Sequence, residues 1–167
     1  MRVGLSSTNN LFESFHSPTK GQLTKDDVFS LIEQTIASNK GSFEIIVGAD
    51  SQLKSRGTFF ALVITVIRPG HGGSFFYHKF QEQRYSSLQQ RIFQEAVYAV
   101  GLATEVRQYL RDHDHDTPVR LHFDIGANGP TRKFIQSLLS LAASNQFRAE
   151  IKPHSFCAST IADKFTR

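Results

Sequence analysis

The sequence predicts an α/β fold in which one mixed sheet of five strands has helices on its faces. Three runs rich in β-branched and aromatic residues follow one another closely at residues 43–50, 58–68 and 74–83, which is typical of an antiparallel meander. Two shorter apolar runs, at 119–125 and 149–152, each come after a segment with helical periodicity. Crossovers of this kind add parallel strands to a sheet. The predicted sheet therefore has three antiparallel strands followed by parallel ones.

The length and composition fit one domain preceded by a short arm. The chain has 167 residues, of which 40% are hydrophobic and 20% are charged, so it can bury a core. Residues 1–22 are rich in Ser, Thr, Asn and Gly and predict an N-terminal arm with little regular structure. Phe12 and Phe15 are expected to attach this arm to the body. Residues 23–167 are predicted to form a single domain.

Charge and cysteine content restrict the partners and the surroundings of the protein. The formal net charge of +4 at pH 7 allows a polyanionic partner but does not establish one. A single cysteine, Cys157, cannot form an intrachain disulfide, which favours a reducing compartment. No apolar run reaches the roughly 18 residues of a membrane span, and no apolar stretch of a secretory signal follows the N-terminus. We therefore expect a cytoplasmic protein that does not enter a membrane.

Capping signals support the predicted helices. Thr24 and Asp27 have the spacing of a capping box, and apolar residues then recur at helical spacing. Ser87 and Gln90 have the same spacing before a long helix. Pro130 suits the first turn of a later helix, because the N–H that proline lacks would be unpaired there. The predicted helices cover residues 25–39, 88–111, 130–145 and 158–165.

Glu95 interrupts the apolar stripe of the long helix. At about 100° per residue, Glu95 lies on the same stripe as five apolar side chains. An ionised carboxylate that faces a sheet is costly unless a metal ion or a basic side chain pairs with it. A slightly rotated helix that lets Glu95 reach water at an edge explains the pattern equally well. The apolar members of the stripe are Leu88, Ile92, Ala99, Leu102 and Val106.

Three aspartates also stand at notable positions. Asp50 ends the apolar strand 43–50, a placement found for catalytic carboxylates and, more often, for residues that begin a turn. Asp124 lies inside the predicted strand 119–125, where aspartate is disfavoured, so a functional role is the better interpretation. Asp163 lies off the apolar face of the last predicted helix, and a solvated side chain explains it as well as a functional one does.

These acids would approach one another if the first and fourth predicted strands were neighbours in the sheet. Asp50 and Asp124 would then stand side by side, and two carboxylates that close repel each other and shift each other's pKa. A pair of divalent cations relieves this repulsion. Such ions, about 3.5–4 Å apart, can activate a water and stabilise the leaving oxygen of a phosphodiester.

Four stretches of the chain carry a family resemblance: VGADSQ at 47–52, RIFQE at 91–95, HFDIGANG at 122–129, and the segment 151–164. Their acids resemble the four-carboxylate site of the ribonuclease H-like fold, and the chain most closely resembles the ribonuclease H-like YkuK family. The resemblance extends from about residue 23 to the C-terminus. The chain departs from the pattern that we expect of this family at Ala49, where we expect Thr, and at His154, where we expect Asp.

The resemblance implies a ribonuclease H-like mixed sheet and a nuclease site that holds Mg²⁺ or Mn²⁺. It assigns Asp50, Glu95, Asp124 and Asp163 as the metal ligands and catalytic acids. It also makes His154, nine residues before the last acid, a candidate for proton transfer or product release. A loop histidine without a catalytic role is the other interpretation of His154.

Polar and basic residues near these acids are the candidates for substrate contacts. The loop 126–132 can present backbone N–H groups to a phosphate, although many strand-to-helix loops carry glycine. Several basic residues, Lys152 among them, would suit a nucleic-acid backbone, and a solvated surface is the alternative. The tract DHDHD at 112–116 lacks the spacing of a tight zinc site and is interpreted as a solvated loop. The predicted substrate contacts are Ser51, Gln52, Asn128, Arg132 and Lys152.

The leading functional hypothesis is a metal-dependent nuclease that hydrolyses phosphodiester bonds by two-metal catalysis. The alternative is a non-catalytic module of the same fold that binds nucleic acid or protein. In a third interpretation the acids hold a structural ion. The sequence specifies neither RNA nor DNA as the partner, and it specifies no oligomeric state.

Overall fold

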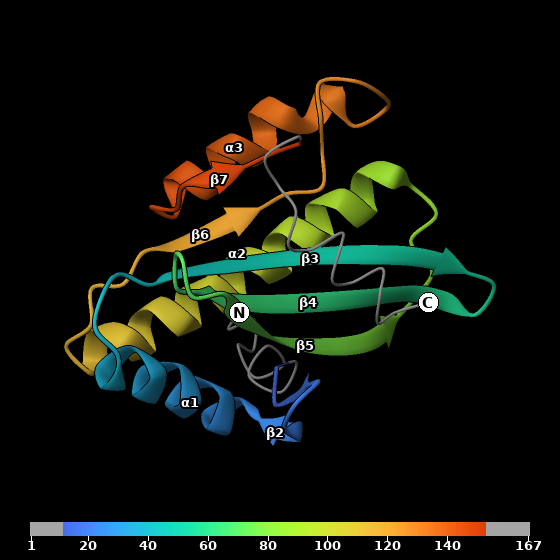
Figure 1. Ribbon diagram of the computed structural model, residues 1–167. Helices are drawn as coiled ribbons and strands as arrows, with labels where there is room; N and C mark the ends of the chain where they lie inside the picture. Colours follow the sequence, from blue (N-terminus) through green and yellow to red (C-terminus); the bar gives the residue numbers. More distant parts are fainter. Residues whose placement is uncertain (1–11, 153–167) are drawn as a thin grey trace, which may run out of the picture.

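Three long antiparallel strands form the centre of the sheet, as predicted (Figure 1). The structure is a computed structural model, and it describes residues 12–152. β3 (Glu44–Lys54) pairs with β4 (Gly57–Ile67) along its whole length, and β4 pairs with β5 (Gly73–Glu82) in the same way. Their β-branched and aromatic side chains suit a pleated surface that is largely buried.

β6 and β7 extend the sheet on the other side of β3 by parallel pairing. β6 (Val119–His122) lies parallel to β3, and β7 (Ala149–Glu150) lies parallel to β6. This confirms the predicted mixed sheet and the adjacency of the first and fourth predicted strands. Within the described residues, the strand order is β2-β1-β5-β4-β3-β6-β7.

A short hairpin that the sequence did not predict forms the opposite edge of the sheet. β1 (Ser14–Ser17) and β2 (Gly21–Thr24) pair with each other, and β1 joins β5 through His16 and Tyr77. The described part of the chain therefore forms a sheet of seven strands rather than five. The expectation of little regular structure was wrong for this segment. Its four-residue strands are short, and their Ser, Thr and Gly content is also typical of loops, so the β pattern was not recognised.

The predicted caps begin the first two helices. α1 (Lys25–Ser38) starts with the expected capping box, in which Thr24 and Asp27 each accept a backbone N–H of the other at 3.1 Å. α2 (Leu88–Asp112) starts with Ser87, whose hydroxyl accepts a backbone N–H three residues further on. Both helices therefore begin where side-chain oxygens satisfy N–H groups that have no partner within the helix.

The last described helix begins later than predicted. α3 (Ile135–Ser144) follows a short 3₁₀ helix, η1 (Arg132–Phe134), and Pro130 lies in the turn before it. The predicted helix 158–165 lies outside the described residues. Among residues 12–152, no helix combines the length and the apolar character that crossing a membrane requires.

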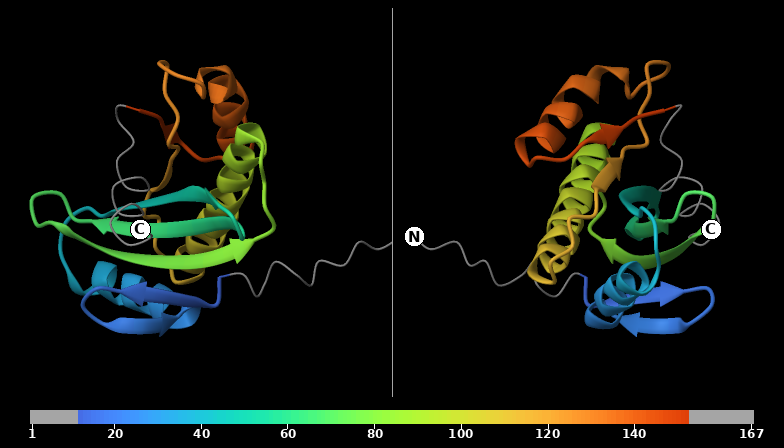
Figure 2. Two further views of the ribbon diagram at one scale, coloured as in Figure 1. Left: turned by 90° about the vertical axis from the view of Figure 1, so that its right-hand side faces the viewer. Right: turned by 60° about the vertical axis from the view of Figure 1, so that its left-hand side comes forward.

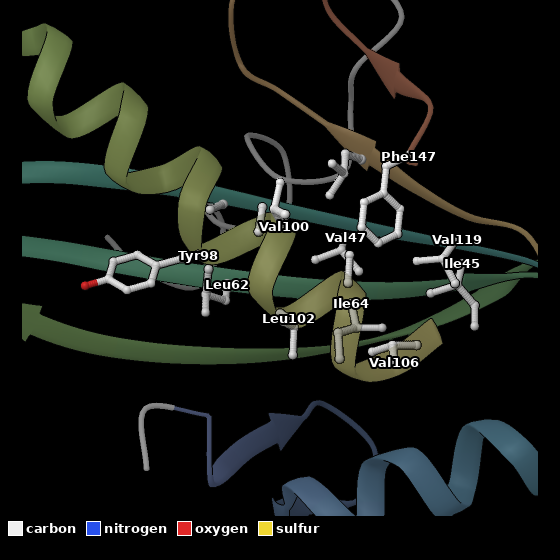
Figure 3. Packing of buried hydrophobic residues seen from close by; sticks show 14 of the residues in the cluster. Ile45, Val47, Leu62, Ile64, Tyr98, Val100, Leu102, Val106, Val119 and Phe147 are labelled. Carbon is white, nitrogen blue, oxygen red and sulfur yellow. The ribbon is translucent and has the colours of Figure 1, made fainter. Parts of the chain in front are cut away.

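α2 packs across the sheet and supplies much of the core (Figures 1 and 2). Val47 of β3, Ile64 of β4 and Leu102 of α2 are completely buried where the two layers meet (Figure 3). Phe12 and Phe15 are buried in the same core, as expected for the residues that attach the N-terminal segment. The remaining helices contribute to the same core through Val28, Phe29, Ile32, Leu138 and Ala142.

Candidate functional site

Glu95 faces the sheet from the first half of α2. The apolar side chains of its stripe are packed in the core, so the helix is oriented as the periodicity predicted. The hydroxyl of Ser51 on β3 donates a hydrogen bond of 2.5 Å to Glu95 Oε1. The Glu95 side chain is thus directed to the sheet, and the residue is partly buried. The helix and the central strand hold it between them.

The surroundings of Glu95 favour its protonated form. Burial raises the pKa of Glu95 well above its ordinary value, and this is the largest effect. The hydrogen bond from Ser51 lowers this pKa, as does the positive charge of Arg91. The negative charges of Asp50 and Asp124 raise it. Two carboxylates from other segments thus act electrostatically on Glu95. We call Asp50, Glu95 and Asp124 the acidic site.

Asp50 lies within β3 and not at the end of a strand, so this part of the prediction was wrong. β3 continues to Lys54, and Asp50 pairs with Ala61 of β4. Successive side chains of a strand point to opposite faces. Because Ser51 points to α2, Asp50 leaves the strand on the other face of the sheet. The polar sequence that follows Asp50 resembles a turn, but its pairing with β4 keeps it extended.

Asp124 follows the end of β6, whereas the sequence predicted it inside a strand. β6 ends at His122, and Asp124 comes two residues later. The buried Oδ1 atom of Asp124 lies 2.8 Å from Nζ of Lys152. Asp124 is accommodated near the end of a buried strand for two reasons. It lies beyond the last residue of β6 that pairs with β3, and the ammonium group of Lys152 neutralises its charge.

The backbone around Asp124 brings Lys152 into position. The N–H of Lys152 donates to the carbonyl of Ile125 at 2.8 Å. Gly126 makes room beside it, because a Cβ at this position would lie 3.2 Å from Cβ of Lys152. The Lys152 side chain is 54% exposed, against 21% for Asp124. The structure thus gives Lys152, predicted as a substrate contact, a partner within the acidic site.

The other predicted substrate contacts are spread over two elements. Gln52 is partly buried on β3, next to Ser51. Asn128 and Arg132 are exposed on the segment that connects β6 to α3, where Thr131 Oγ1 accepts the Gly126 N–H at 3.2 Å. Neither Asn128 nor Arg132 has a hydrogen bond or ion pair with the acidic site in the described part of the chain.

Two predicted site residues, His154 and Asp163, lie outside the described residues. Within residues 12–152, no three side chains of His, Cys, Asp or Glu are grouped closely enough to hold a metal ion. Asp50 and Ser51 leave β3 on opposite faces, and Lys152 contacts Asp124. The described residues alone do not form the compact cluster that the sequence predicted.

The fold is that of a known class of proteins. The model of the family described as "Ribonuclease H-like" matches residues 27–167, and the chain belongs to this family. This confirms the resemblance drawn from the sequence and the predicted class of fold.

The chain is also similar to the uncharacterized protein YkuK of Bacillus subtilis (strain 168). The two sequences are 26% identical in an alignment 167 positions long, which covers 92% of this chain and 96% of YkuK. No solved structure matches the chain significantly.

Proposed function

We propose that this protein is a metal-dependent nuclease whose acidic site hydrolyses phosphodiester bonds. The observation that carries the proposal is the position of Glu95. A carboxylate is held against the sheet by Ser51, and two further carboxylates raise its pKa. A fold does not require such an arrangement for stability, since gathering carboxylates costs free energy. Membership of the ribonuclease H-like family supports the same assignment.

The donor set suits a hard divalent cation. Asp50, Glu95 and Asp124 offer carboxylate oxygens, which Mg²⁺ and Mn²⁺ prefer as ligands. We propose these residues together with Asp163 as the ligands. Bound cations of this kind would activate a water and stabilise the leaving oxygen of the phosphodiester.

The residues of the chain have separate parts in this proposal. Ser51 orients Glu95 through its hydrogen bond. Lys152 neutralises Asp124 while no metal is bound, and it must release Oδ1 before that atom can become a ligand. His154 is the proposed group for proton transfer or product release.

The proposed substrate is a nucleic acid. Its phosphates would approach the site past Gln52, Asn128 and Arg132, and the formal net charge of +4 at pH 7 favours a polyanion over other large substrates. Catalysis by two metal ions and a cytoplasmic location belong to the same proposal.

A nuclease assay tests the proposal directly. The purified chain is incubated with Mg²⁺ or Mn²⁺ and with RNA, an RNA–DNA hybrid, single-stranded DNA or branched DNA. We expect cleavage of at least one substrate and its loss in Asp50→Asn and Asp124→Asn. Asp114→Asn is the matched control, because Asp114 is exposed and its φ of 61° suits asparagine as well as aspartate. Unchanged cleavage in both site variants would refute the proposal.

The ion pair of Asp124 supports a second candidate, a non-catalytic module that binds nucleic acid. Lys152 already supplies a positive charge where the nuclease proposal requires a metal ion. A module of this kind would bind nucleic acid in a salt-dependent way, without cleavage. Asp50→Asn and Asp124→Asn would then leave its affinity nearly unchanged. The cleavage assay and a binding titration of the same variants separate the two candidates.

A further inference from the structure

A second site-like feature lies at the end of the sheet opposite the acidic site. A pocket of about 530 Å³ opens where β3 and β6 begin, beside the last turns of α2 and the turn that follows α3. In Figure 1, β3 runs from left to right, so its first residues lie at the left, whereas Asp50 belongs to the second half of the strand. A pocket of this volume suits a small molecule of nucleotide size. We call it the arginine pocket.

The lining of the arginine pocket carries an excess of positive charge. Its charged residues are Arg107, Arg111, Arg120, Arg148, Glu44 and Asp116. Four guanidinium groups thus face two carboxylates. His115 also lines the pocket, and its Nε2 lies 2.9 Å from Glu33 Oε1. This excess is not recognisable in the sequence, because the four arginines come from three separate segments.

One arginine is already neutralised by the fold. Arg120 forms ion pairs with Glu44 and with Glu150, and the hydrogen bond that it donates to Glu44 is the main reason that its pKa is raised. Arg148 is different: its side chain is 77% exposed, and its Nε lies 3.9 Å from an oxygen of the same Glu150. One carboxylate therefore serves two guanidinium groups, and Arg148 keeps most of its capacity for another anion.

Arg107 is held rigidly at the wall of the pocket. Its two terminal nitrogens donate to the carbonyls of Asn145 and Gln146 at 3.0 and 2.9 Å. Its guanidinium also lies 3.8 Å from the ring centroid of Phe147. These contacts fix the guanidinium plane but bring no carboxylate to it. Burial lowers the pKa of Arg107, and the neighbouring charge of Arg111 lowers it further.

Arg111 lies one helical turn after Arg107 on the same face of α2. Like charges at this spacing destabilise a helix. Among residues 12–152, no ion pair involves Arg107 or Arg111. Two guanidinium groups thus line the same pocket, and neither is ion-paired with a carboxylate of the described chain. An anion bound between them would relieve this repulsion.

We infer that the arginine pocket binds a small phosphorylated ligand, through Arg107 and Arg111 with Arg148 at the rim. A guanidinium group donates two parallel hydrogen bonds to phosphate oxygens, which suits the planar groups found here. The limited volume favours a free nucleotide-sized molecule over a nucleic-acid strand. This inference concerns residues outside the acidic site and does not depend on nuclease activity.

Calorimetric titration of the purified chain with pyrophosphate and with adenosine monophosphate tests the inference. We expect saturable binding of at least one probe, and Arg111→Gln should weaken it about tenfold or more, as for the loss of one charge-assisted hydrogen bond. Arg56→Gln is the matched control: it removes the same charge from an exposed position in the turn between β3 and β4, and it should bind as the wild type does.

Several outcomes would overturn the inference. The inference fails if neither probe binds, or if Arg111→Gln binds the probes as tightly as the wild type does. It also fails if Arg56→Gln weakens binding as much as Arg111→Gln does. A single-stranded oligonucleotide without a terminal phosphate is also titrated. If it binds more tightly than both probes and Arg111→Gln weakens its binding, the pocket binds a nucleic-acid strand and not a small ligand. If Arg111→Gln does not fold, Arg148→Gln replaces it, because that side chain is mostly exposed.

Discussion

Replacing Lys152 by methionine should increase the affinity of the acidic site for a divalent cation. The substitution keeps the length and the apolar stem of the side chain and removes its ammonium group. In the structure this group lies 2.8 Å from Asp124 Oδ1, where it competes with any metal ion for the same oxygen. Without the competitor, Asp124 becomes available as a ligand.

The structure sets the size of this effect. Lys152 is 54% exposed, so water and salt screen the ion pair, although the Asp124 oxygen is buried. An exposed pair contributes about 0.2–1 kcal/mol, and the buried oxygen favours the upper half of this range. A competitor of about 0.5–1 kcal/mol weakens metal binding about two- to fivefold. We expect an increase of this size in Mn²⁺ affinity for Lys152→Met.

Calorimetric titration with Mn²⁺ measures the change, with thermal unfolding as a second readout. Without metal, Lys152→Met should melt at a lower temperature than the wild type, because Asp124 loses its partner; Mn²⁺ should restore more stability to the variant than to the wild type. Lys20→Met controls for the loss of a charge at an exposed position. An Mn²⁺ affinity equal to that of the wild type, or a gain that persists when Asp124→Asn is added, would refute the reasoning.

Three further substitutions test the acidic site. Glu95→Gln should make the protein more stable than the wild type at neutral pH without metal. Because the pKa of Glu95 is raised in the folded state, the wild type loses stability as the pH rises from the unfolded-state pKa toward the folded-state pKa. Urea unfolding between pH 4 and 8 should show this loss in the wild type and a smaller loss in the variant. Ser51→Ala removes a hydrogen bond to the partly buried Glu95 and should lower the free energy of unfolding by about 1–3 kcal/mol, measured by urea denaturation. Gly126→Ala would place a Cβ 3.2 Å from Cβ of Lys152. It should lower the melting temperature and raise the Mn²⁺ affinity, as Lys152→Met does. An unchanged Mn²⁺ affinity would count against the proposed role of Gly126.

The sequence predicted those parts of the fold that local signals determine. The three central strands and α2 lie close to their predicted residues, because long β-branched runs and a strong helical period are recognisable without tertiary information. The capping box of Thr24 was also recognisable. The hairpin of β1 and β2 was missed, because its residues are extended through pairing with each other and with β5.

The candidate site was predictable in its members and not in its contacts. Glu95 was found because a carboxylate on an apolar stripe conflicts with simple burial. The partner of Asp124 could not be found in the same way: Lys152 reaches it only because β7 follows β6 in parallel and the chain after β7 passes Gly126. Likewise, Asp50 and Ser51 are adjacent in sequence, but their side chains lie on opposite faces of the sheet because β3 continues to Lys54.

The length of α2 separates two groups of charged residues, the acidic site near its start and the arginines near its end. Glu95 and Arg111 are separated by 16 residues of one continuous helix, or about 24 Å at the usual rise. This distance is about three times the Debye length at physiological ionic strength, so the charges at the two ends are largely screened from each other. An approaching polyanion therefore meets each end separately at close range, and the arginine end attracts it. Encounters in which the arginine end leads are therefore favoured, and a divalent cation bound at the other end would reduce this orientational preference.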